Sequence, residues 1–149
     1  MDKKTFHNSI VKKLMQDDIS SLDAFEAFQN EDTELYKKIE FTHEFLDVLC
    51  FKLKQSKSTM DKDILAAYLF KIFQQTFKAY RYNLKFISSQ FKSIVTYYRN
   101  HKQYSKAIQV LEFLIQHGIT DNDSEGFHIQ LDKMYRKRIK FEKKLRMKD

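Results

Sequence analysis

The sequence contains no proline and no tryptophan, and only two glycines and one cysteine among its 149 residues. Proline is the strongest helix breaker and glycine the next, so little in this composition interrupts a helix. We therefore expect an all-α protein. A chain of this length can bury a core without disulfides or metals, and we expect a single domain over residues 1–149.

The single cysteine bears on where the protein works. Cys50 lies in the apolar run FLDVLCF, and one thiol cannot form a disulfide within one chain. This favours a reducing compartment, and we expect a cytoplasmic protein. Long hydrophobic runs are also absent, since no window reaches the roughly 18 uncharged apolar residues that a membrane-spanning helix needs. We expect no membrane partner.

The scarcity of glycine also limits the possible chemistry. Phosphate-binding loops, dinucleotide-binding turns and the nucleophile elbow of hydrolases need glycines at fixed spacing, and none of these patterns occurs. Among the five histidines we expect no pair with a carboxylate partner four residues away, and Cys50 has no second thiol, so a zinc site is not expected. We therefore predict a protein that is not an enzyme, with no cofactor and no metal site.

Positive charge is concentrated at the C-terminus. The formal net charge is +7, and from Asp132 onward nine basic residues accompany three acidic ones, which gives this segment +6. The preceding 131 residues carry only +1. The basic character therefore belongs to the last helix and not to the whole fold.

Apolar residues recur at helical spacing and predict a compact helical bundle of six or seven helices. Residues 1–57 should contain three helices, at about 6–16, 20–28 and 33–55. Ser20 with Asp23, and Ser58 with Asp61, have the spacing of capping boxes that start helices. Residues 58–119 should contain a buried helix, a turn near Tyr82–Asn83 and a helical hairpin ending at Gly118.

The basic C-terminal helix should occupy residues 120–149. One stripe of this helix is apolar and should face inward: Phe127, Leu131, Met134, Phe141 and Leu145.

Two apolar-periodic segments meet at a short polar break within Phe91–Gly118. Five of their residues match the aromatic, large apolar and small positions of a known two-helix unit: Phe91, Ile94, Tyr98, Ala107 and Leu111. The stretch thus resembles one divergent tetratricopeptide (TPR) repeat. The windows one period earlier and later do not repeat the pattern, so a short TPR-like stack and an ordinary helical bundle both remain open.

The resemblance implies a binding role, because the first helix of such a unit lines a concave groove. The residues off its core stripe are Ser89, Lys92, Thr96, Arg99 and Asn100. Two cations in a polar row could receive an acidic peptide or a C-terminal carboxylate. The alternative is an ordinary solvated helix face. We predict a non-catalytic scaffolding or regulatory domain that acts by protein–protein interaction.

The leading alternative is nucleic-acid binding through the C-terminal helix. Its cations occupy much of the helix surface and could neutralise phosphates: Lys133, Arg136, Lys137, Lys140, Lys143, Lys144 and Arg146. The segment Asp121–Asp132 has oxygen-bearing residues at the spacing of a calcium loop, but its last position is Asp where Glu is normal. We interpret this segment as a helix N-cap.

Overall fold

The computed structural model describes residues 2–29, 35–79, 84–117 and 126–147, and the side chains of residues 3, 35–40, 76–79 and 84–89 lie outside this description. Within these ranges all regular structure is α-helical, in seven helices, which confirms the predicted class. The chain divides into two compact units, residues 1–81 (unit 1) and 82–149 (unit 2), each described below by itself. The expectation of one domain stays a prediction.

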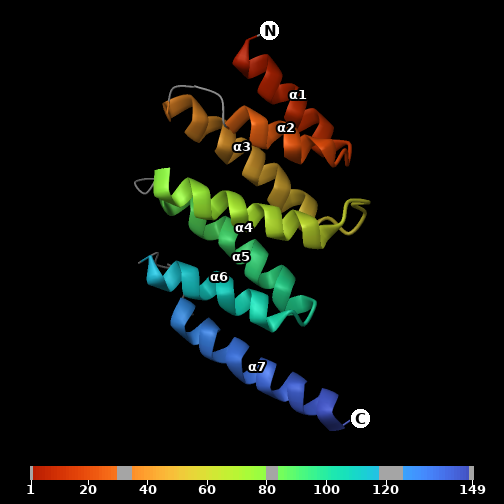
Figure 1. The fold of residues 1–149 in the computed structure, drawn as a ribbon, viewed down its shortest axis with the longest axis vertical. Coiled ribbons are helices and arrows are strands. Elements are labelled where there is room, and N and C mark those ends of the chain that lie inside the picture. The colour runs from red at the N-terminus through yellow and green to blue at the C-terminus, as the bar shows by residue number, and fades with distance from the viewer. Residues whose placement is uncertain (1, 30–34, 80–83, 118–125, 148–149) are drawn as a thin grey trace. The chain divides into compact units, whose positions relative to one another are not determined.

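Unit 1 contains the first four helices: α1 (Lys3–Met15), α2 (Ser20–Gln29), α3 (Leu35–Lys54) and α4 (Lys62–Ala79). Helix α1 packs against both α2 and α3, and α3 packs against α4 (Figure 1). Two polar contacts join α4 to α2 as well. The Tyr68 hydroxyl donates to the Leu22 carbonyl oxygen at 2.9 Å, and Lys71 pairs with Glu26 at 2.9 Å.

An aromatic cluster lies in the core of unit 1. Phe25 of α2 and Phe45 of α3 are fully buried and stack face to face, with ring centroids 3.8 Å apart. His7 of α1 is also fully buried and stacks on Phe41, with centroids 4.6 Å apart. Its Nε2 atom lies 3.3 Å from the Glu44 carboxylate. Each large ring packed in this way buries about 150–250 Å² and so contributes strongly to a small helical core.

The two predicted capping boxes of unit 1 were wrong in detail. The Asp18 carboxylate caps α2, since it accepts hydrogen bonds from the Ser20 N–H at 3.0 Å and from the Ser20 hydroxyl at 2.7 Å. These bonds lower the pKa of Asp18. The Asp61 carboxylate caps α4 by accepting from the Asp63 N–H at 2.9 Å. Asp18 lies two residues before α2 and Asp61 lies one residue before α4, and in each case the carboxylate is a better acceptor at the positive end of the helix than the predicted serine hydroxyl.

Two large apolar residues of unit 1 are substantially exposed. Phe6 is 38% exposed and Ile64 is 45% exposed. In α1 the buried face is formed by His7, Ile10 and Leu14.

Unit 2 contains the last three helices: α5 (Leu84–Asn100), α6 (Tyr104–Gln116) and α7 (Phe127–Met147). Consecutive helices run antiparallel, and α6 packs against both α5 and α7 (Figure 1). The predicted helical hairpin is therefore present as α5–α6. Its five matched positions are all at most 4% exposed: Phe91, Ile94, Tyr98, Ala107 and Leu111. The predicted turn at Tyr82–Asn83 and the cap at Gly118 lie outside the described residues.

Candidate functional site

The turn between α5 and α6 is held in a defined conformation. The Gln103 N–H donates to the Tyr98 carbonyl at 2.8 Å and the Lys102 N–H donates to the Arg99 carbonyl at 3.1 Å, which together form a Schellman motif. Lys102 occupies the left-handed position of this motif, with φ of 58°. Glycine is usual there because a side chain strains the backbone. The turn therefore presents a lysine at a place where most sequences carry none.

Helix α7 packs along α6 through contacts at both of its ends. Phe127 is buried near its start, and the Tyr135 hydroxyl donates a hydrogen bond to the Glu112 carboxylate of α6. This bond raises the pKa of Tyr135. Farther along, Phe141 packs edge-on against Tyr104 at the first residue of α6, with centroids 5.9 Å apart and planes at 73°. These contacts fix α7 beside the α5–α6 turn.

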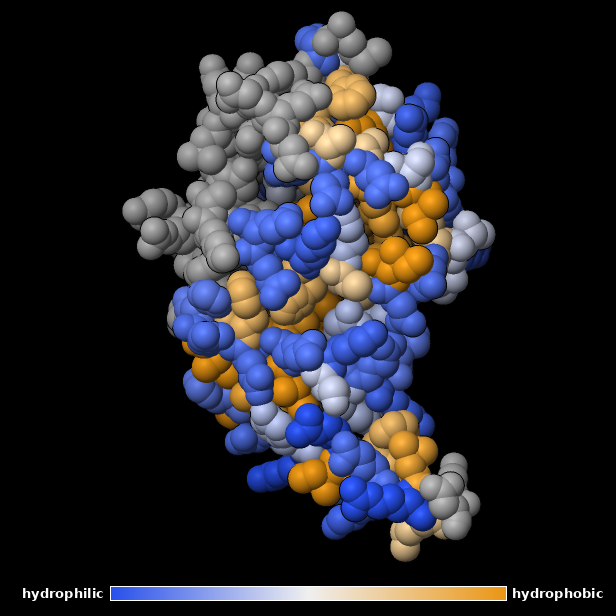
Figure 2. Space-filling model, in the orientation of Figure 1, coloured by the Kyte–Doolittle hydropathy of each residue, from blue (hydrophilic) through white to orange (hydrophobic). Residues whose placement is uncertain are grey.

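A surface hollow of about 250 Å³ lies where α7 passes this turn. We name it the lysine groove, and its lining residues are Lys102, Tyr104, Lys137, Lys140, Phe141, Lys144 and Leu145. Tyr104 and Phe141 are half-buried, and Leu145 is 49% exposed instead of facing inward as predicted. Figure 2 shows orange apolar side chains among blue hydrophilic ones along α7. The groove thus combines an apolar surface with four ammonium groups.

The electrostatics of the groove favour an anion. None of the ion pairs between described residues includes a groove lysine. Helix α6 begins beside the groove, and Gln103 provides no side-chain cap for its first N–H groups. The positive end of the helix dipole therefore adds to the charge of the four lysines. A negatively charged group entering the groove would meet several donors in one place.

The structure brings together only part of the predicted nucleic-acid surface. Three of its seven residues line the groove: Lys137, Lys140 and Lys144. Lys133 continues the same stripe one turn earlier, since these four lysines follow one another at spacings of four, three and four residues. By the same helical spacing Arg136, Lys143 and Arg146 belong to other faces of α7.

The predicted partner-binding row on α5 forms a narrow strip. Thr96 and Asn100 are exposed and Lys92 and Arg99 are half-buried, whereas every other side chain from Gln90 to Tyr98 is buried. The row is therefore accessible, and it carries two cations. The side chain of Ser89 lies outside the described residues.

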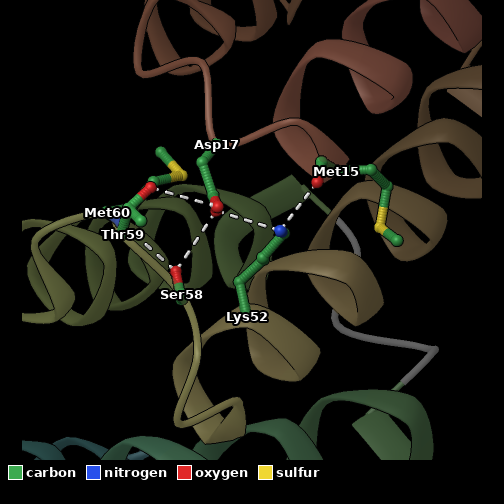
Figure 3. A network of polar contacts seen from close by, with 6 residues as sticks. All are labelled: Met15, Asp17, Lys52, Ser58, Thr59 and Met60. Atoms are coloured by element: carbon green, nitrogen blue, oxygen red, sulfur yellow. Dashed lines mark hydrogen bonds and ion pairs between the residues drawn. The ribbon is translucent and has the colours of Figure 1, made fainter.

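Unit 1 contains a cluster of polar contacts around Asp17 and Lys52 (Figure 3). Lys52, whose side chain is 5% exposed, bonds the Met15 carbonyl oxygen at 2.7 Å and the Asp17 carboxylate at 2.9 Å. The hydroxyls of Ser58 and Thr59 each donate to the same carboxylate at 3.2 Å. The cluster joins the α1–α2 turn to α3 and to the α3–α4 loop. Its donors and acceptors satisfy one another, so we interpret it as structural.

Metal binding finds no support in the described ranges, where no group of three His, Cys, Asp or Glu residues could hold an ion. His43 does pair with Asp47 one helical turn away at 3.0 Å, a contact that our reading of the histidines overlooked. The first five residues of the calcium-like segment, 121–125, lie outside the described residues.

Sequence reasoning missed two residues of the groove. Lys102 and Tyr104 stand some 33 residues or more before Lys137 in the sequence, and only the packing of α7 on α6 brings the two segments together. The spacing of the α7 lysines could have shown that four of them share one side of the helix, and so could have restricted the predicted binding surface to that side.

No protein-family model, curated protein or solved structure matches this chain. Among the helices that the structure describes, none combines the length and the hydropathy required to cross a bilayer.

Proposed function

We propose that this chain is a non-catalytic helical domain that binds another protein, and that unit 2 carries the binding surface. The distribution of charge is the observation that supports this most strongly. Unit 1 has thirteen basic and thirteen acidic residues, whereas unit 2 has fourteen basic and seven acidic ones, so the entire net charge of +7 belongs to unit 2. Such a surface steers and orients an acidic partner.

Two features of unit 2 support this proposal locally. The α5 row of Lys92, Thr96, Arg99 and Asn100 is the accessible strip of an otherwise buried helix segment. The lysine groove adds four cations around an apolar surface. An apolar centre with a polar rim is the usual anatomy of a protein-binding site. A scaffolding or regulatory role is part of the same proposal, because binding without chemistry acts by bringing partners together.

We also propose that the α5–α6 hairpin packs as a TPR-like unit in a cytoplasmic protein. The burial of all five matched positions supports the first part, since these are the positions that such a unit places between its helices. The single buried Cys50 supports the second, since it leaves the chain without a disulfide framework.

The experiment uses the purified full chain and an array of acidic, neutral and basic peptides. We expect saturable binding of acidic peptides, and amide shifts in nuclear magnetic resonance spectra that fall in unit 2 and spare the aromatic core of unit 1. Basic peptides of matched length are the control. If no acidic peptide binds saturably, the protein-binding proposal is wrong.

Nucleic-acid binding is a second candidate, which the lysine stripe of α7 favours. From Lys133 to Lys144 the stripe extends about 16 Å along the helix, enough to follow several phosphates of a backbone. Each phosphate contact on duplex DNA contributes about 0.9 to the slope of log affinity against log salt. Tight binding of DNA or RNA at physiological salt, together with a steep slope, would make this the principal function.

A further inference from the structure

We propose that the lysine groove binds an acidic protein segment, which places one large apolar side chain in the hollow and its carboxylates against the groove lysines. The inference rests on the proposed protein-binding function and deepens it, because it identifies the site and the chemical class of the partner. Residues of the α5–α6 turn and of α7 would recognise the acidic segment. The predicted binding row on α5 is not required for binding in the lysine groove.

The size of the hollow fits a single large apolar side chain. A cavity of about 150 Å³ with apolar walls holds a benzene-sized group, and the groove offers about 250 Å³. Tyr104, Phe141 and Leu145 supply its apolar surface. Leu145 is 49% exposed, so a side chain docked here would remove apolar surface from water that the free protein leaves in contact with it. This contribution anchors the partner.

The charges of the groove fit carboxylates on both sides of that anchor. Lys137 and Lys144 are two helical turns apart, about 10 Å along α7, and Lys140 lies between them. Lys102 faces the same hollow from the turn, and its backbone is held by the two hydrogen bonds of the Schellman motif. A segment with acidic residues before and after one apolar residue would therefore meet lysines from two elements of the fold.

The rings in the groove favour a peptide over a nucleic acid. Single-stranded nucleic acids bind by stacking bases on exposed aromatic faces. Here Tyr104 and Phe141 pack edge-on against each other, with planes at 73°, and both are half-buried. The third apolar group is the aliphatic Leu145. This surface suits an aliphatic or aromatic side chain better than a row of stacked bases.

The test measures fluorescence anisotropy of a short labelled peptide in which one leucine is flanked on each side by glutamates. Two matched peptides replace the leucine by serine or the glutamates by glutamines, and a labelled single-stranded RNA of similar length is the competing probe. We expect the first peptide to bind about tenfold more tightly than either altered peptide. Equal affinity for the leucine and serine peptides would show that the hollow holds no anchor.

Two double variants of the full chain separate the groove from general charge. Lys137→Gln with Lys144→Gln removes two groove lysines, and Arg136→Gln with Lys143→Gln removes two cations at the same seven-residue spacing on another face of α7. We expect the first pair to weaken peptide binding about tenfold and the second less than about threefold. Circular dichroism checks that both variants remain folded. Equal losses in the two variants would overturn the groove as the site.

A third double variant distinguishes failure of the groove proposal from failure of the protein-binding proposal. Lys92→Gln with Arg99→Gln disrupts the α5 row and leaves the groove intact. If this variant loses the peptide while the groove variant keeps it, protein binding stands and the groove proposal is wrong. If RNA binds and the peptides do not, both the groove proposal and the protein-binding function are wrong.

Discussion

Asp17 and Lys102 occupy the same position in two helix-ending turns, with φ of 60° and 58°. Each is the left-handed residue of a Schellman motif, in which the next residue donates to a carbonyl five positions back: Asp18 to Lys13 at 3.0 Å and Gln103 to Tyr98 at 2.8 Å. Neither turn uses the glycine that this geometry favours. The side chains differ in what they do, since Asp17 is bound in the unit 1 cluster whereas Lys102 lines the groove.

This difference predicts opposite responses to glycine. Lys102→Gly relieves the backbone strain of the left-handed position, and it deletes a side chain that lines the groove without holding the fold together. We therefore expect it to raise the free energy of unfolding by about 1 kcal/mol. Asp17→Gly relieves the same strain but deletes the carboxylate that Lys52, Ser58 and Thr59 bind, and we expect net destabilisation. Urea denaturation measures both. A loss of stability in Lys102→Gly would mean that its side chain contributes to the fold.

The Asp17 cluster also predicts a dependence of stability on pH. The hydrogen bond from Lys52 holds the pKa of Asp17 below its ordinary value of 3.8. A lowered folded-state pKa contributes stability above that ordinary value, and this contribution is lost as the pH falls through the lowered pKa. We expect Asp17→Asn to be less stable than wild type at about pH 7 and the difference to shrink towards about pH 2. Thermal melts across this range measure the difference, and a constant difference would contradict the assignment.

Lys52 should matter more than an exposed lysine. Its ammonium group is almost fully buried and bonds both Met15 and Asp17. We expect Lys52→Met to cost about 1–3 kcal/mol, because it leaves these acceptors without their donor. The matched control is Lys54→Met, an exposed lysine on the same helix. A double-mutant cycle with Asp17→Asn should show coupling between the two positions, and simple additivity would argue against the pair.

Ala107 tests the packing of the α5–α6 hairpin. It is completely buried, so Ala107→Leu should overpack the interior of unit 2 and cost about 1–3 kcal/mol. Gln109→Leu adds a similar side chain at an exposed position of α6 and should change stability little. The comparison of melting temperatures decides the matter. If the two variants melt alike, Ala107 is not a close-packed position.

The end of α7 should be dispensable for folding. The buried residues of α7 are Phe127 and Met134, both before residue 137, whereas Phe141 is half-buried and Leu145 is exposed. We expect deletion of residues 137–149 to leave a cooperative thermal transition, with helical signal reduced only by the residues removed. The variant should lose the acidic peptide. Retained peptide binding would instead point to the α5 row.

The helices were predictable because their signals are local. Without proline and with few glycines, apolar periodicity marked each helix, and the hairpin with Ala107 at its interior was found in this way. Rotation of a helix about its axis was less predictable. Phe6 and Leu145 both fall on apolar stripes, yet packing against neighbouring helices left them 38% and 49% exposed.

The groove could be predicted only in part, because it joins distant segments. Lys137, Lys140 and Lys144 were selected from their charge alone, within a set that also contained cations of other faces. Lys102 lies in the polar break between the two helices of the hairpin, and no neighbouring residue in the sequence indicates that α7 packs beside it. The left-handed backbone of Lys102 is likewise visible only in the folded turn.

The groove is shared between α7 and the turn that precedes α6, and this arrangement makes binding depend on docking. If the end of α7 detaches from Tyr104, the lysines of α7 and Lys102 separate and the hollow is lost. A partner that binds only the docked form must therefore lower the population of the form in which α7 is detached, by mass action. Hydrogen exchange at the amides of residues 137–147 would report occupancy of the groove directly, without any label on the partner.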